Sequence, residues 1–462
     1  MHHSPSPRRR RVSNGIRSTG TQATSRQAPP STLVVLLQGR VAGVIRRGST
    51  GGSHVLTYEA SWRTAPDAFP LSLSLPLASQ VHAGPAVTYY LRGLLPDSEA
   101  RLNAVAHQFG VPADDPFALL AHVGEDCPGA VQFARPDRVP VLENGGAGHV
   151  EWLTDAEVAG VLRELSAENT AGPQASLAGQ FSLPGALAKV ALTWDPIRSR
   201  WGRPSGRAAT THIIKPPLSG ILHHTENEHL CLELAQAVGC IAAKSSILRI
   251  EDQTAIVVER YDRERIGGII HRLHQEDISQ ALGVNPRLKY RAEGAPGISD
   301  IVTLLREQTS HGLEDIYRFL RAVALNWAIG GTDAHPRNYS LLIAPRGNVT
   351  LAPLYDLASA LLLRTRTNEA ELPVAMSVGG GTTLGDITGA TWAAQASEIR
   401  VDPERLLTDI ASLLDRMVDA APAIASLAVS EGIDEAFATR FGARIRARAA
   451  ACATSVGSRL RA

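Results

Sequence analysis

The segment Gly330-Gly331-Thr332-Asp333-Ala334-His335-Pro336-Arg337-Asn338 decides the fold of this chain. Its glycines and its proline predict a loop. An apolar pattern with helical spacing runs into the loop over residues 316–327. After the loop, residues 339–343 and 349–351 predict two short strands, and Asp356 follows them. The sequence therefore predicts a helix, a loop that carries an Asp and an Asn, a hairpin and a second carboxylate, in that order.

The spacing of these polar residues is typical of a phosphoryl-transfer site of the protein-kinase kind. In such sites an Asp accepts the proton of the substrate hydroxyl, and an Asn five residues later holds a magnesium ion. A second Asp, placed after a hairpin, chelates the metal ions that bridge the phosphates of ATP. Asp333, Asn338 and Asp356 are therefore candidates for these three roles, since Mg²⁺ prefers amide and carboxylate oxygens as ligands.

The preceding part of the chain predicts the other half of such a site. Residues 183–189 (LPGALAK) form a loop of small residues whose backbone N–H groups can approach phosphates, although the loop lacks the G-K-[ST] of a Walker A motif. Lys215 ends a predicted strand, where kinases place the Lys that contacts the phosphates and pairs with a helix Glu. Glu228, in the first turn of the next helix, is the candidate partner. The segment Glu259-Arg260-Tyr261 ends another strand, at the position of an adenine-binding hinge.

Length and composition limit the class of protein. A chain of 462 residues predicts two or three domains, and 44% hydrophobic residues with a net charge of +1 describe an ordinary globular protein without a global field for nucleic acid or membrane. No apolar run reaches the roughly 18 residues that span a bilayer. The first 30 residues contain no apolar segment that resembles a secretion signal. The four scattered cysteines predict free thiols and a cytoplasmic protein.

Local signals divide the chain. Residues 1–30 predict a disordered basic tail, and residues 136–150 a linker. The strands are predicted near 33–37, 41–45, 54–60, 69–75, 189–194, 209–215, 246–250 and 255–260, with a polar loop between 194 and 209. Helices are predicted over 97–109 with Asp97 as cap, over 154–166 with Thr154 as cap, over 227–238, and from the Asp402-Pro403 cap onward. From residue 275 the pattern is mainly helical.

Taken together, these segments resemble the HipA family of bacterial toxin kinases over residues 32–450. The order and the number of the matching stretches make the resemblance specific, since none would suffice alone. The stretches include FPLSLSLPL (69–77), LLPD (94–97), VGEDCPGAVQF (123–133), THIIKP (211–216), VERYDR (258–263) and QEDISQALG (275–283), with the loops at 182–192, 332–341 and 351–359.

The resemblance implies an α+β fold: a two-lobed, protein-kinase-like (HipA) structure with an N-terminal α/β subdomain and a mainly α-helical C-lobe. The domains would be residues 31–150 for the N-terminal subdomain, 151–265 for the N-lobe with the phosphate loop, and 266–462 for the C-lobe with the catalytic loop.

The resemblance also assigns roles to single residues. Asp333 would be the catalytic Asp, with ATP as the phosphoryl donor and Mg²⁺ held by Asn338 and Asp356. Ser182 matches the serine that family members autophosphorylate, which withdraws the phosphate loop and switches the kinase off. The implied ATP-binding residues are Pro184, Gly185, Ala186, Leu187, Ala188, Lys189, Lys215, Glu259, Arg260, Tyr261, His335, Asn338, Tyr355 and Asp356.

At the level of function, the resemblance implies a serine/threonine protein kinase toxin that causes growth arrest and persistence. Its substrate would be an aminoacyl-tRNA synthetase, such as glutamyl-tRNA synthetase. Its partner would be a HipB-like helix-turn-helix antitoxin, and any contact with DNA would come through that complex. No membrane partner is implied.

One departure from the family pattern leaves alternatives open. The family loop commonly has Gln at the position of Leu187, often followed by a polar residue, whereas Leu187 and Ala188 are both apolar. A pseudokinase that serves as a partner of an antitoxin and its operator therefore stays open, as does a kinase of an unrelated substrate. Arg440, Arg444 and Arg448, spaced four residues apart, would form either a basic stripe for such a partner or a solvated helix face.

Overall fold

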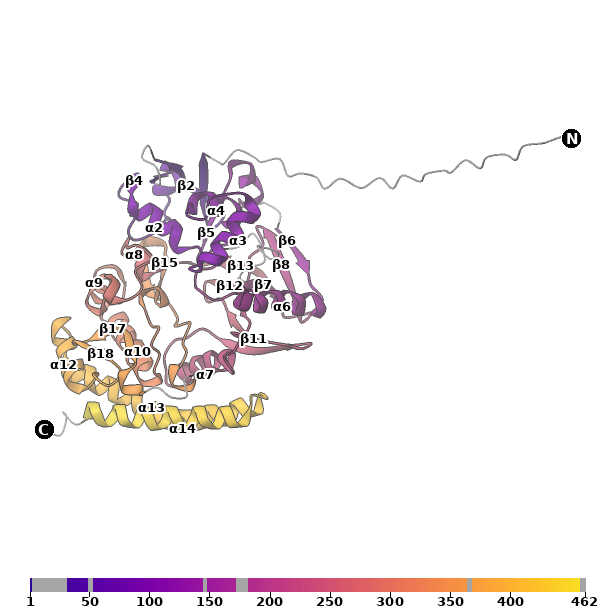
Figure 1. Cartoon of the computed structure of the whole chain (residues 1–462). Helices are drawn as coiled ribbons and strands as arrows, with labels where there is room; N and C mark the ends of the chain where they lie inside the picture. The colour runs from indigo at the N-terminus through magenta and orange to yellow at the C-terminus, as the bar shows by residue number, and fades with distance from the viewer. Residues whose placement is uncertain (2–30, 49–52, 144–147, 172–181, 364–367, 458–462) are drawn as a thin grey trace.

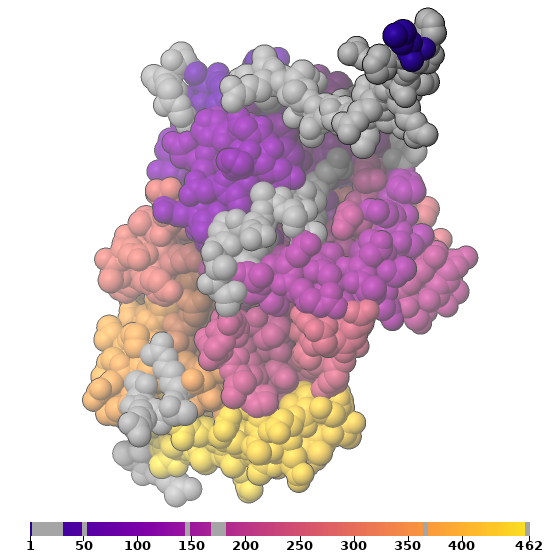
Figure 2. All heavy atoms as spheres, turned by 45° about the vertical axis from the view of Figure 1, so that its right-hand side comes forward, coloured from indigo at the N-terminus to yellow at the C-terminus, as the bar shows by residue number. Residues whose placement is uncertain are grey.

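The computed structural model describes residue 1 and residues 31–48, 53–143, 148–171, 182–363 and 368–457. The predicted tail over residues 1–30 thus lies outside the described part, apart from Met1. The chain forms three parts in sequence order: the N-terminal subdomain, the N-lobe and the C-lobe. Figure 2 shows the N-terminal subdomain in violet above the N-lobe in magenta, with the C-terminal helices in yellow at the opposite end.

The N-terminal subdomain is built on a five-stranded antiparallel sheet with the order β4-β3-β2-β1-β5 (Figure 1). Its strands are β1 (Thr32–Leu37), β2 (Arg40–Arg47), β3 (His54–Tyr58), β4 (Val81–Gly84) and β5 (Val131–Ala134). Its helices are α1 (Ala60–Arg63), α2 (Pro85–Gly93), α3 (Glu99–Phe109), α4 (Pro116–Val123) and α5 (Val139–Leu142). The strands predicted near 33–37, 41–45 and 54–60 are confirmed. Gln38 and Gly39 both have positive φ at the β1–β2 turn, as a two-residue hairpin turn requires.

The strand predicted over residues 69–75 is wrong. The segment forms turns, with a single bridge between Ser72 and Leu75. Leu71 N donates to the Tyr58 hydroxyl (2.8 Å), and Leu73 N donates to Glu276 Oε1 (2.7 Å). Because side chains satisfy these backbone groups, the segment needs no neighbouring strand.

Helix α3 begins one residue later than predicted, with Ser98 as its cap. Ser98 Oγ accepts from Arg101 N (3.4 Å). The predicted cap, Asp97, is unavailable because its carboxylate binds Arg337 and Lys289 of the C-lobe. The helix ends at Gly110, which has a left-handed backbone.

The N-lobe is a six-stranded antiparallel sheet with the order β10-β11-β9-β7-β8-β6, flanked by α6 (Asp155–Ala171) and α7 (His224–Ala237). The strands are β6 (Gly148–Trp152), β7 (Val190–Asp195), β8 (Arg200–Gly206), β9 (His212–Lys215), β10 (Ser245–Ile250) and β11 (Gln253–Glu259). The predicted cap of α6 is confirmed: Thr154 N donates to Glu157 Oε2 (2.8 Å), and Glu157 N donates to Thr154 Oγ1 (3.3 Å).

Two predictions about this sheet are wrong. The predicted polar loop between 194 and 209 contains β8, and the predicted linker over 136–150 ends in the first residues of β6, which pairs with β8. Trp194 and Trp201 face each other across the β7–β8 pair, with ring centroids 4.5 Å apart. Such an aromatic pair stabilises the hairpin. The Arg, Gly and Pro residues of β8 are not typical of a strand, so the sequence pattern did not predict it.

The C-lobe is mainly helical, as predicted, but it holds more strands than predicted. Its helices are α8 (Ile278–Ala281), α9 (Ile298–Gln308), α10 (Gly312–Ile329), α11 (Ala360–Leu363), α12 (Gly389–Glu398), α13 (Pro403–Ser430) and α14 (Glu435–Gly457). Strands β14 (His274–Asp277), β15 (Ser340–Ala344) and β16 (Asn348–Leu351) form one sheet. A hairpin of β12 (Arg263–Ile266) with β13 (Ile269–Arg272) stands at the junction of the two lobes, and β17 (Pro373–Val378) pairs with β18 (Gly381–Thr383). Of these strands, only β15 and β16 were predicted.

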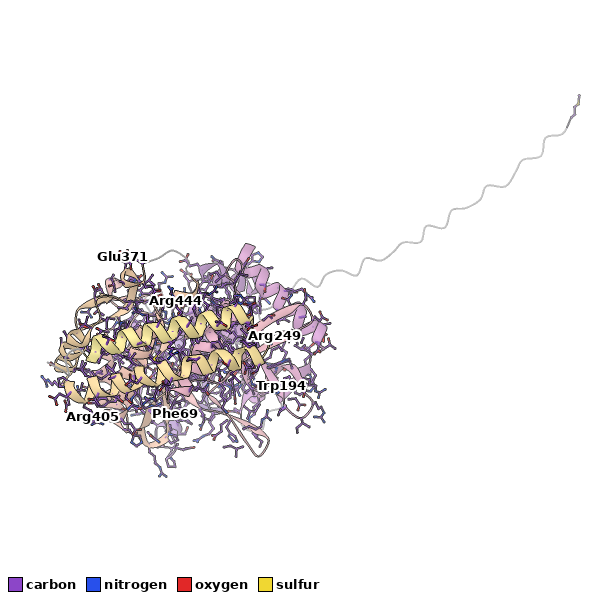
Figure 3. The ribbon with its side chains drawn as sticks, turned by 90° about the horizontal axis from the view of Figure 1, so that it is seen from below. Phe69, Trp194, Arg249, Glu371, Arg405 and Arg444 are labelled. Carbon is purple, nitrogen blue, oxygen red and sulfur yellow. The ribbon has the colours of Figure 1, made fainter. Side chains whose placement is uncertain are left out.

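Helices α13 and α14 lie side by side along one end of the molecule (Figure 3). The Asp402 carboxylate caps α13, as predicted. The three arginines of the predicted basic stripe all make contacts within the chain. Arg444 pairs with Glu369, the Arg448 guanidinium donates to the carbonyl of Leu384 (3.4 Å), and Arg440 lies over the ring of Phe437.

The antiparallel sheets and the helical C-terminal half together confirm the predicted α+β class. Within the described ranges, no helix is long and apolar enough to cross a membrane.

Candidate active site

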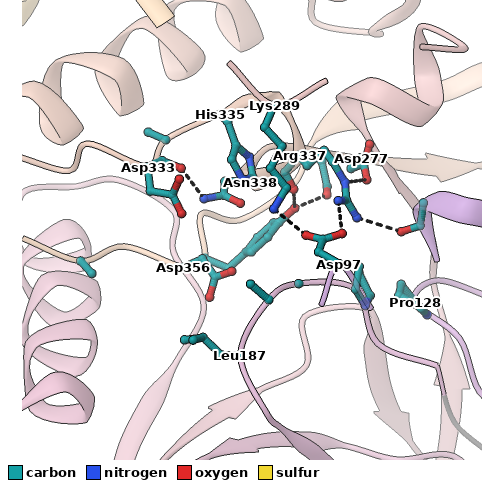
Figure 4. A pocket seen from close by; sticks show the side chains of 18 of the residues that line it. Asp97, Pro128, Leu187, Asp277, Lys289, Asp333, His335, Arg337, Asn338 and Asp356 are labelled. Atoms are coloured by element: carbon teal, nitrogen blue, oxygen red, sulfur yellow. Dashed lines mark hydrogen bonds and ion pairs between the residues drawn. The ribbon is translucent and has the colours of Figure 1, made fainter. Parts of the chain in front are cut away.

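A cavity of about 210 Å³ lies where the three parts meet (Figure 4). The loop over residues 330–338 contributes Asp333, His335 and Asn338 to its wall, and Asp356 enters from the loop after β16. The N-lobe contributes Lys189 and the loop before it, and the N-terminal subdomain contributes Asp97. The structure therefore brings together residues that are more than 200 positions apart in the sequence.

Lys215 is the central cation beside this cavity. Its Nζ donates to Glu228 Oε1 (2.7 Å) and to Asp356 Oδ1. Lys215 and Glu228 are buried, whereas the Asp356 side chain is 36% exposed. The single ammonium thus joins β9, α7 and the loop after β16.

The pKa values around Lys215 follow from burial and from these pairings. Burial acts to lower the pKa of Lys215, but Asp356 and Glu228 raise it above its ordinary value. Burial acts to raise the pKa of Asp356, but Lys215 and Lys189 hold it below its ordinary value. Burial raises the pKa of Glu228. Asp356 has a φ of +54°, a conformation that costs free energy for a residue with a side chain and that clusters at functional sites.

Asp333 is fixed by its neighbours at the mouth of the cavity. Its Oδ1 accepts from the Tyr290 hydroxyl (2.7 Å). Its backbone carbonyl accepts from Asn338 Nδ2 (2.9 Å), which leaves Asn338 Oδ1 as the amide atom that can ligate a cation. Burial lowers the pKa of His335, whose Nδ1 is a buried atom without a hydrogen-bond partner.

Sequence reasoning missed Tyr290 and the ion cluster beside it. Tyr290 is 40% exposed and lies in a polar stretch that carries no kinase-like spacing. Lys289 pairs with Asp97 Oδ2 (2.7 Å), and Arg337 contacts Asp97 and, at 3.5 Å, Asp277. One signal for Lys289 was present, because only four of the 46 basic residues are Lys and three of them lie at this site.

The loop before β7 covers one side of the cavity. Gly185 has a φ of +112°, a backbone conformation that residues with a side chain rarely adopt, and a Cβ here would also displace Lys189 Nζ, which would lie 2.4 Å from it. Gly185 O accepts from Asp97 N (3.1 Å), which fastens the loop to the N-terminal subdomain. Lys189 Nζ donates to Pro184 O (2.8 Å), and burial lowers the pKa of Lys189 to about 8.

The two apolar residues of this loop face different surroundings. Leu187 lines the cavity, as Pro184, Gly185 and Ala186 do. Ala188 is buried in the hydrophobic core of the N-lobe. A polar side chain at Ala188 would therefore enter that core, which gives a structural reason for this departure from the family pattern.

Of the remaining predicted residues, Tyr355 lines the cavity and the others do not. Ser182 is 2% exposed, and its Oγ donates to Leu94 O (2.7 Å). Tyr355 lines the cavity, and its ring stacks on that of Tyr261 at 5.9 Å. Glu259 ends β11. Arg260 points into a buried ion network, where it binds Asp262 (2.7 Å), so its side chain is not brought to the cavity.

The donor set fits a magnesium ion. In the part of the chain that the structure describes, no three His, Cys, Asp or Glu side chains form a complete metal site. Asn338 and Asp356 supply a hard amide oxygen and a hard carboxylate oxygen, and both line the cavity. Mg²⁺ is commonly held by one or two such ligands, with substrate phosphates and water completing its shell.

The central ion pair makes a prediction about stability. Replacing Lys215 by Met leaves the Glu228 and Asp356 carboxylates without their cation, which should lower the free energy of unfolding by about 3 kcal/mol. The double variant Lys215→Met/Glu228→Gln should recover part of this loss, because one buried charge is removed. Urea denaturation measures both. Lys244→Met, at a lysine whose side chain is 77% exposed, is the matched control. Equal effects at Lys215 and Lys244 would contradict the pairing.

Comparison with known proteins identifies the family. The HipA-like C-terminal domain matches residues 181–423, and the HipA N-terminal domain matches residues 33–134. A protein of Sinorhizobium fredii that is named as a kinase, Y4mE, is 33% identical over 425 residues, which are 90% of this chain and 97% of that one. The serine/threonine-protein kinase toxin HipA of Shewanella oneidensis is 26% identical over 342 residues, 71% of this chain and 75% of the toxin.

The fold is shared with a solved structure. A chain in the complex of S. oneidensis HipA, HipB and operator DNA superposes with a TM-score of 0.76 at 22% identity, over 92% of this chain and 98% of that chain. This likeness confirms the predicted two-lobed, kinase-like fold. One family domain covers the N-terminal subdomain, and the other covers more than half of the whole chain. The protein therefore belongs to the HipA family.

Proposed function

We propose that this protein is an ATP-dependent serine/threonine protein kinase that acts as a toxin. The observation that carries the proposal is the meeting of Asp333, Asn338 and Asp356 in one cavity, with Lys215 bound to Asp356. A kinase needs these groups at one place: a carboxylate for the substrate proton, oxygen ligands for the metal, and a cation for the phosphates.

Each side chain has a defined task in this proposal. Asp333 accepts the proton of the substrate serine or threonine hydroxyl. Asn338 and Asp356 hold Mg²⁺, which supplies positive charge that neutralises the transferring phosphoryl group when it is bound. Lys215 contacts the phosphates while Glu228 keeps it oriented. The backbone of residues 184–189 covers the phosphates, and the Lys189 ammonium adds a second positive charge.

We assign the adenine to the strand end at Glu259-Arg260-Tyr261. The backbone N–H groups of Glu259 and Arg260 already donate to Lys244 O (2.8 Å) and Thr211 O (2.9 Å). Tyr261 is therefore our candidate for adenine recognition. Its support is its position: its ring stacks on Tyr355, and its hydroxyl donates to Gln275 (2.5 Å), and both partners line the cavity.

We further propose that phosphorylation of Ser182 switches the kinase off. Ser182 N donates to Asp126 O (3.1 Å) and Ser182 Oγ donates to Leu94 O (2.7 Å), in a buried position. A phosphate carries a charge of about −1.5 to −2 and three acceptor oxygens, which cannot take the place of a donor to a carbonyl. Phosphoserine would have to leave this position, and the adjoining phosphate loop would follow it.

The substrate and the partner are proposed from the family. A HipB-like helix-turn-helix antitoxin is supported by the S. oneidensis complex, which contains HipA, HipB and operator DNA. An aminoacyl-tRNA synthetase, such as glutamyl-tRNA synthetase, is our proposed substrate, with growth arrest and persistence as the outcome. The cytoplasm is the proposed compartment, in keeping with four free cysteines.

The proposed functional units are the N-terminal subdomain from residue 31, the N-lobe to residue 265, and the C-lobe from residue 266. Because β6 begins at Gly148, we place the start of the N-lobe there and not at residue 151. The pseudokinase alternative is disfavoured, since the three acidic and amide side chains that a kinase needs share one cavity.

Incubation of dephosphorylated protein with Mg-ATP tests the proposal. We expect intact mass and peptide mapping to find one added phosphate on Ser182, absent in Asp333→Asn, and phosphate on added glutamyl-tRNA synthetase. Phosphate on another residue would contradict only the switch, and transfer to a different protein only the substrate. No transfer at all, together with no thermal shift by Mg-ATP, would contradict the kinase.

Lys189 makes a prediction about pH. Because its pKa is lowered to about 8, its ammonium is fully formed at pH 7 and is lost as the pH rises through 8. A phosphate ligand favours the ammonium, so ATP affinity should be nearly full at pH 7 and should fall as the pH rises through 8, by about tenfold between pH 7.5 and pH 9. Calorimetric titrations with Mg-ATP at pH 7, 8 and 9 measure this. Lys189→Met should bind more weakly and without this pH dependence; an equal slope in both proteins would contradict the role of Lys189.

A further inference from the structure

The side chain of Asp333 depends on one contact for its orientation. Its backbone carbonyl accepts from Asn338 Nδ2 (2.9 Å) and from His335 N (2.8 Å), which fix the loop but not the carboxylate. Among the described residues, the only hydrogen bond to the carboxylate itself comes from the Tyr290 hydroxyl, which donates to Oδ1 (2.7 Å). Because Asp333 is exposed, close packing does not hold its side chain in place.

This contact divides the two carboxylate oxygens of Asp333 between two tasks. The phenol of Tyr290 occupies Oδ1, and no hydrogen bond within the described ranges reaches Oδ2. A general base must come within about 2.6–3.2 Å of the atom whose proton it takes. Oδ2 is therefore the oxygen left for the hydroxyl of a substrate, and the contact with Tyr290 sets the direction in which Oδ2 points.

Tyr290 is itself fixed by its neighbours. Glu293 Oε2 accepts from the N–H groups of Lys289 (2.9 Å) and Tyr290 (3.2 Å). Tyr290 O accepts from Glu293 N (2.8 Å) at the start of the 3₁₀ helix η3 (Arg291–Glu293). The phenol ring lies edge-on to the ring of His335, with the centroids 6.1 Å apart. Both the backbone and the ring of Tyr290 therefore have a defined position.

The phenol remains a hydrogen-bond donor at neutral pH. Burial raises the pKa of Tyr290 to about 12, and the hydrogen bond to Asp333 acts in the same direction. A donor to an ionised carboxylate makes a charge-assisted hydrogen bond, which is shorter and stronger than a neutral one. The contact is therefore strong enough to orient an exposed side chain.

The residue before Tyr290 joins this contact to the N-terminal subdomain. Lys289 Nζ pairs with Asp97 Oδ2 (2.7 Å; Figure 4), and Asp97 N donates to Gly185 O (3.1 Å). The loop before β7, the N-terminal subdomain and the segment of Tyr290 thus form a continuous series of contacts that ends at the Asp333 carboxylate.

We propose that Tyr290 is a positioning residue for phosphoryl transfer: its hydroxyl holds Asp333 Oδ1 so that Oδ2 faces the substrate hydroxyl. This inference rests on the proposed kinase function, in which Asp333 accepts the proton of that hydroxyl. Tyr290 is not among the residues that line the cavity, so it has no part in binding ATP. Loss of its hydroxyl slows the transfer step alone, because a base without its guide is often turned away from the substrate.

Transfer of the γ-phosphoryl group from labelled Mg-ATP to any acceptor, protein or water, tests the inference in the full chain. Tyr290→Phe removes only the hydroxyl. We expect it to lower the maximal rate by about tenfold or more, while the half-saturating ATP concentration and the melting temperature stay unchanged. Tyr89→Phe, on α2 and away from the cavity wall, is the matched control and should leave all three quantities unchanged.

The other outcomes separate this inference from the proposed function. A merely structural role of Tyr290 would lower the melting temperature or raise the half-saturating ATP concentration, and would overturn the inference. So would an unchanged rate in Tyr290→Phe beside an active unaltered protein. A faster rate would also overturn it, since the phenol would then block the place of the substrate hydroxyl. No transfer by the unaltered protein would overturn the proposed function and the inference with it.

Discussion

One buried ammonium determines the geometry of the candidate active site. Lys215 lies between Glu228 and Asp356, and so fixes a strand of the N-lobe, a helix beside it and a loop of the C-lobe relative to one another. The two carboxylates share this one buried cation. Since Asp356 is the more exposed of the two acids, we propose that it exchanges its ammonium for a metal ion. We add this exchange to the proposed function: before Mg-ATP binds, Lys215 and Asp356 hold each other in place, and when it binds Asp356 would release Lys215.

The N-terminal subdomain is part of the site and not an appendage to it. Asp97 binds Arg337 and Lys289 of the C-lobe through its carboxylate, and its N–H group donates to the carbonyl of Gly185 in the loop before β7. Leu94 O accepts from Ser182. The same subdomain supplies Asp126 to the buried ion network. The candidate active site therefore lies at the boundary of this subdomain, and a shift of the subdomain would change it.

The sequence predicts the parts of this structure that depend on local order. The helix, loop, hairpin and carboxylate around Asp333 fall within some 40 residues, where periodicity and turn residues report the backbone directly. Periodicity and turn residues do not report which distant segments contact one another. Tyr290 reaches Asp333 from 43 positions away, and Arg272 reaches Asp126 from 146. No local pattern selects such partners. Distant contacts also explain two wrong predictions. Residues 69–75 were predicted as a strand, but side chains satisfy their backbone groups in place of a neighbouring strand. β8 was predicted as a loop, but a cross-strand Trp pair stabilises it as a strand.

The central claim is that Asp356 would exchange its contact with Lys215 for a magnesium ion when Mg-ATP binds. Calorimetric titration of ATP with Mg²⁺ and with EDTA, for the unaltered protein and for Asp356→Asn, tests it most directly, with Asp252→Asn at an exposed aspartate as control. We expect Mg²⁺ to tighten ATP binding by about tenfold or more in the unaltered protein and in the control, and to have little effect in Asp356→Asn. An ATP affinity that ignores Mg²⁺ in the unaltered protein, or a full Mg²⁺ effect in Asp356→Asn, would contradict the proposed site.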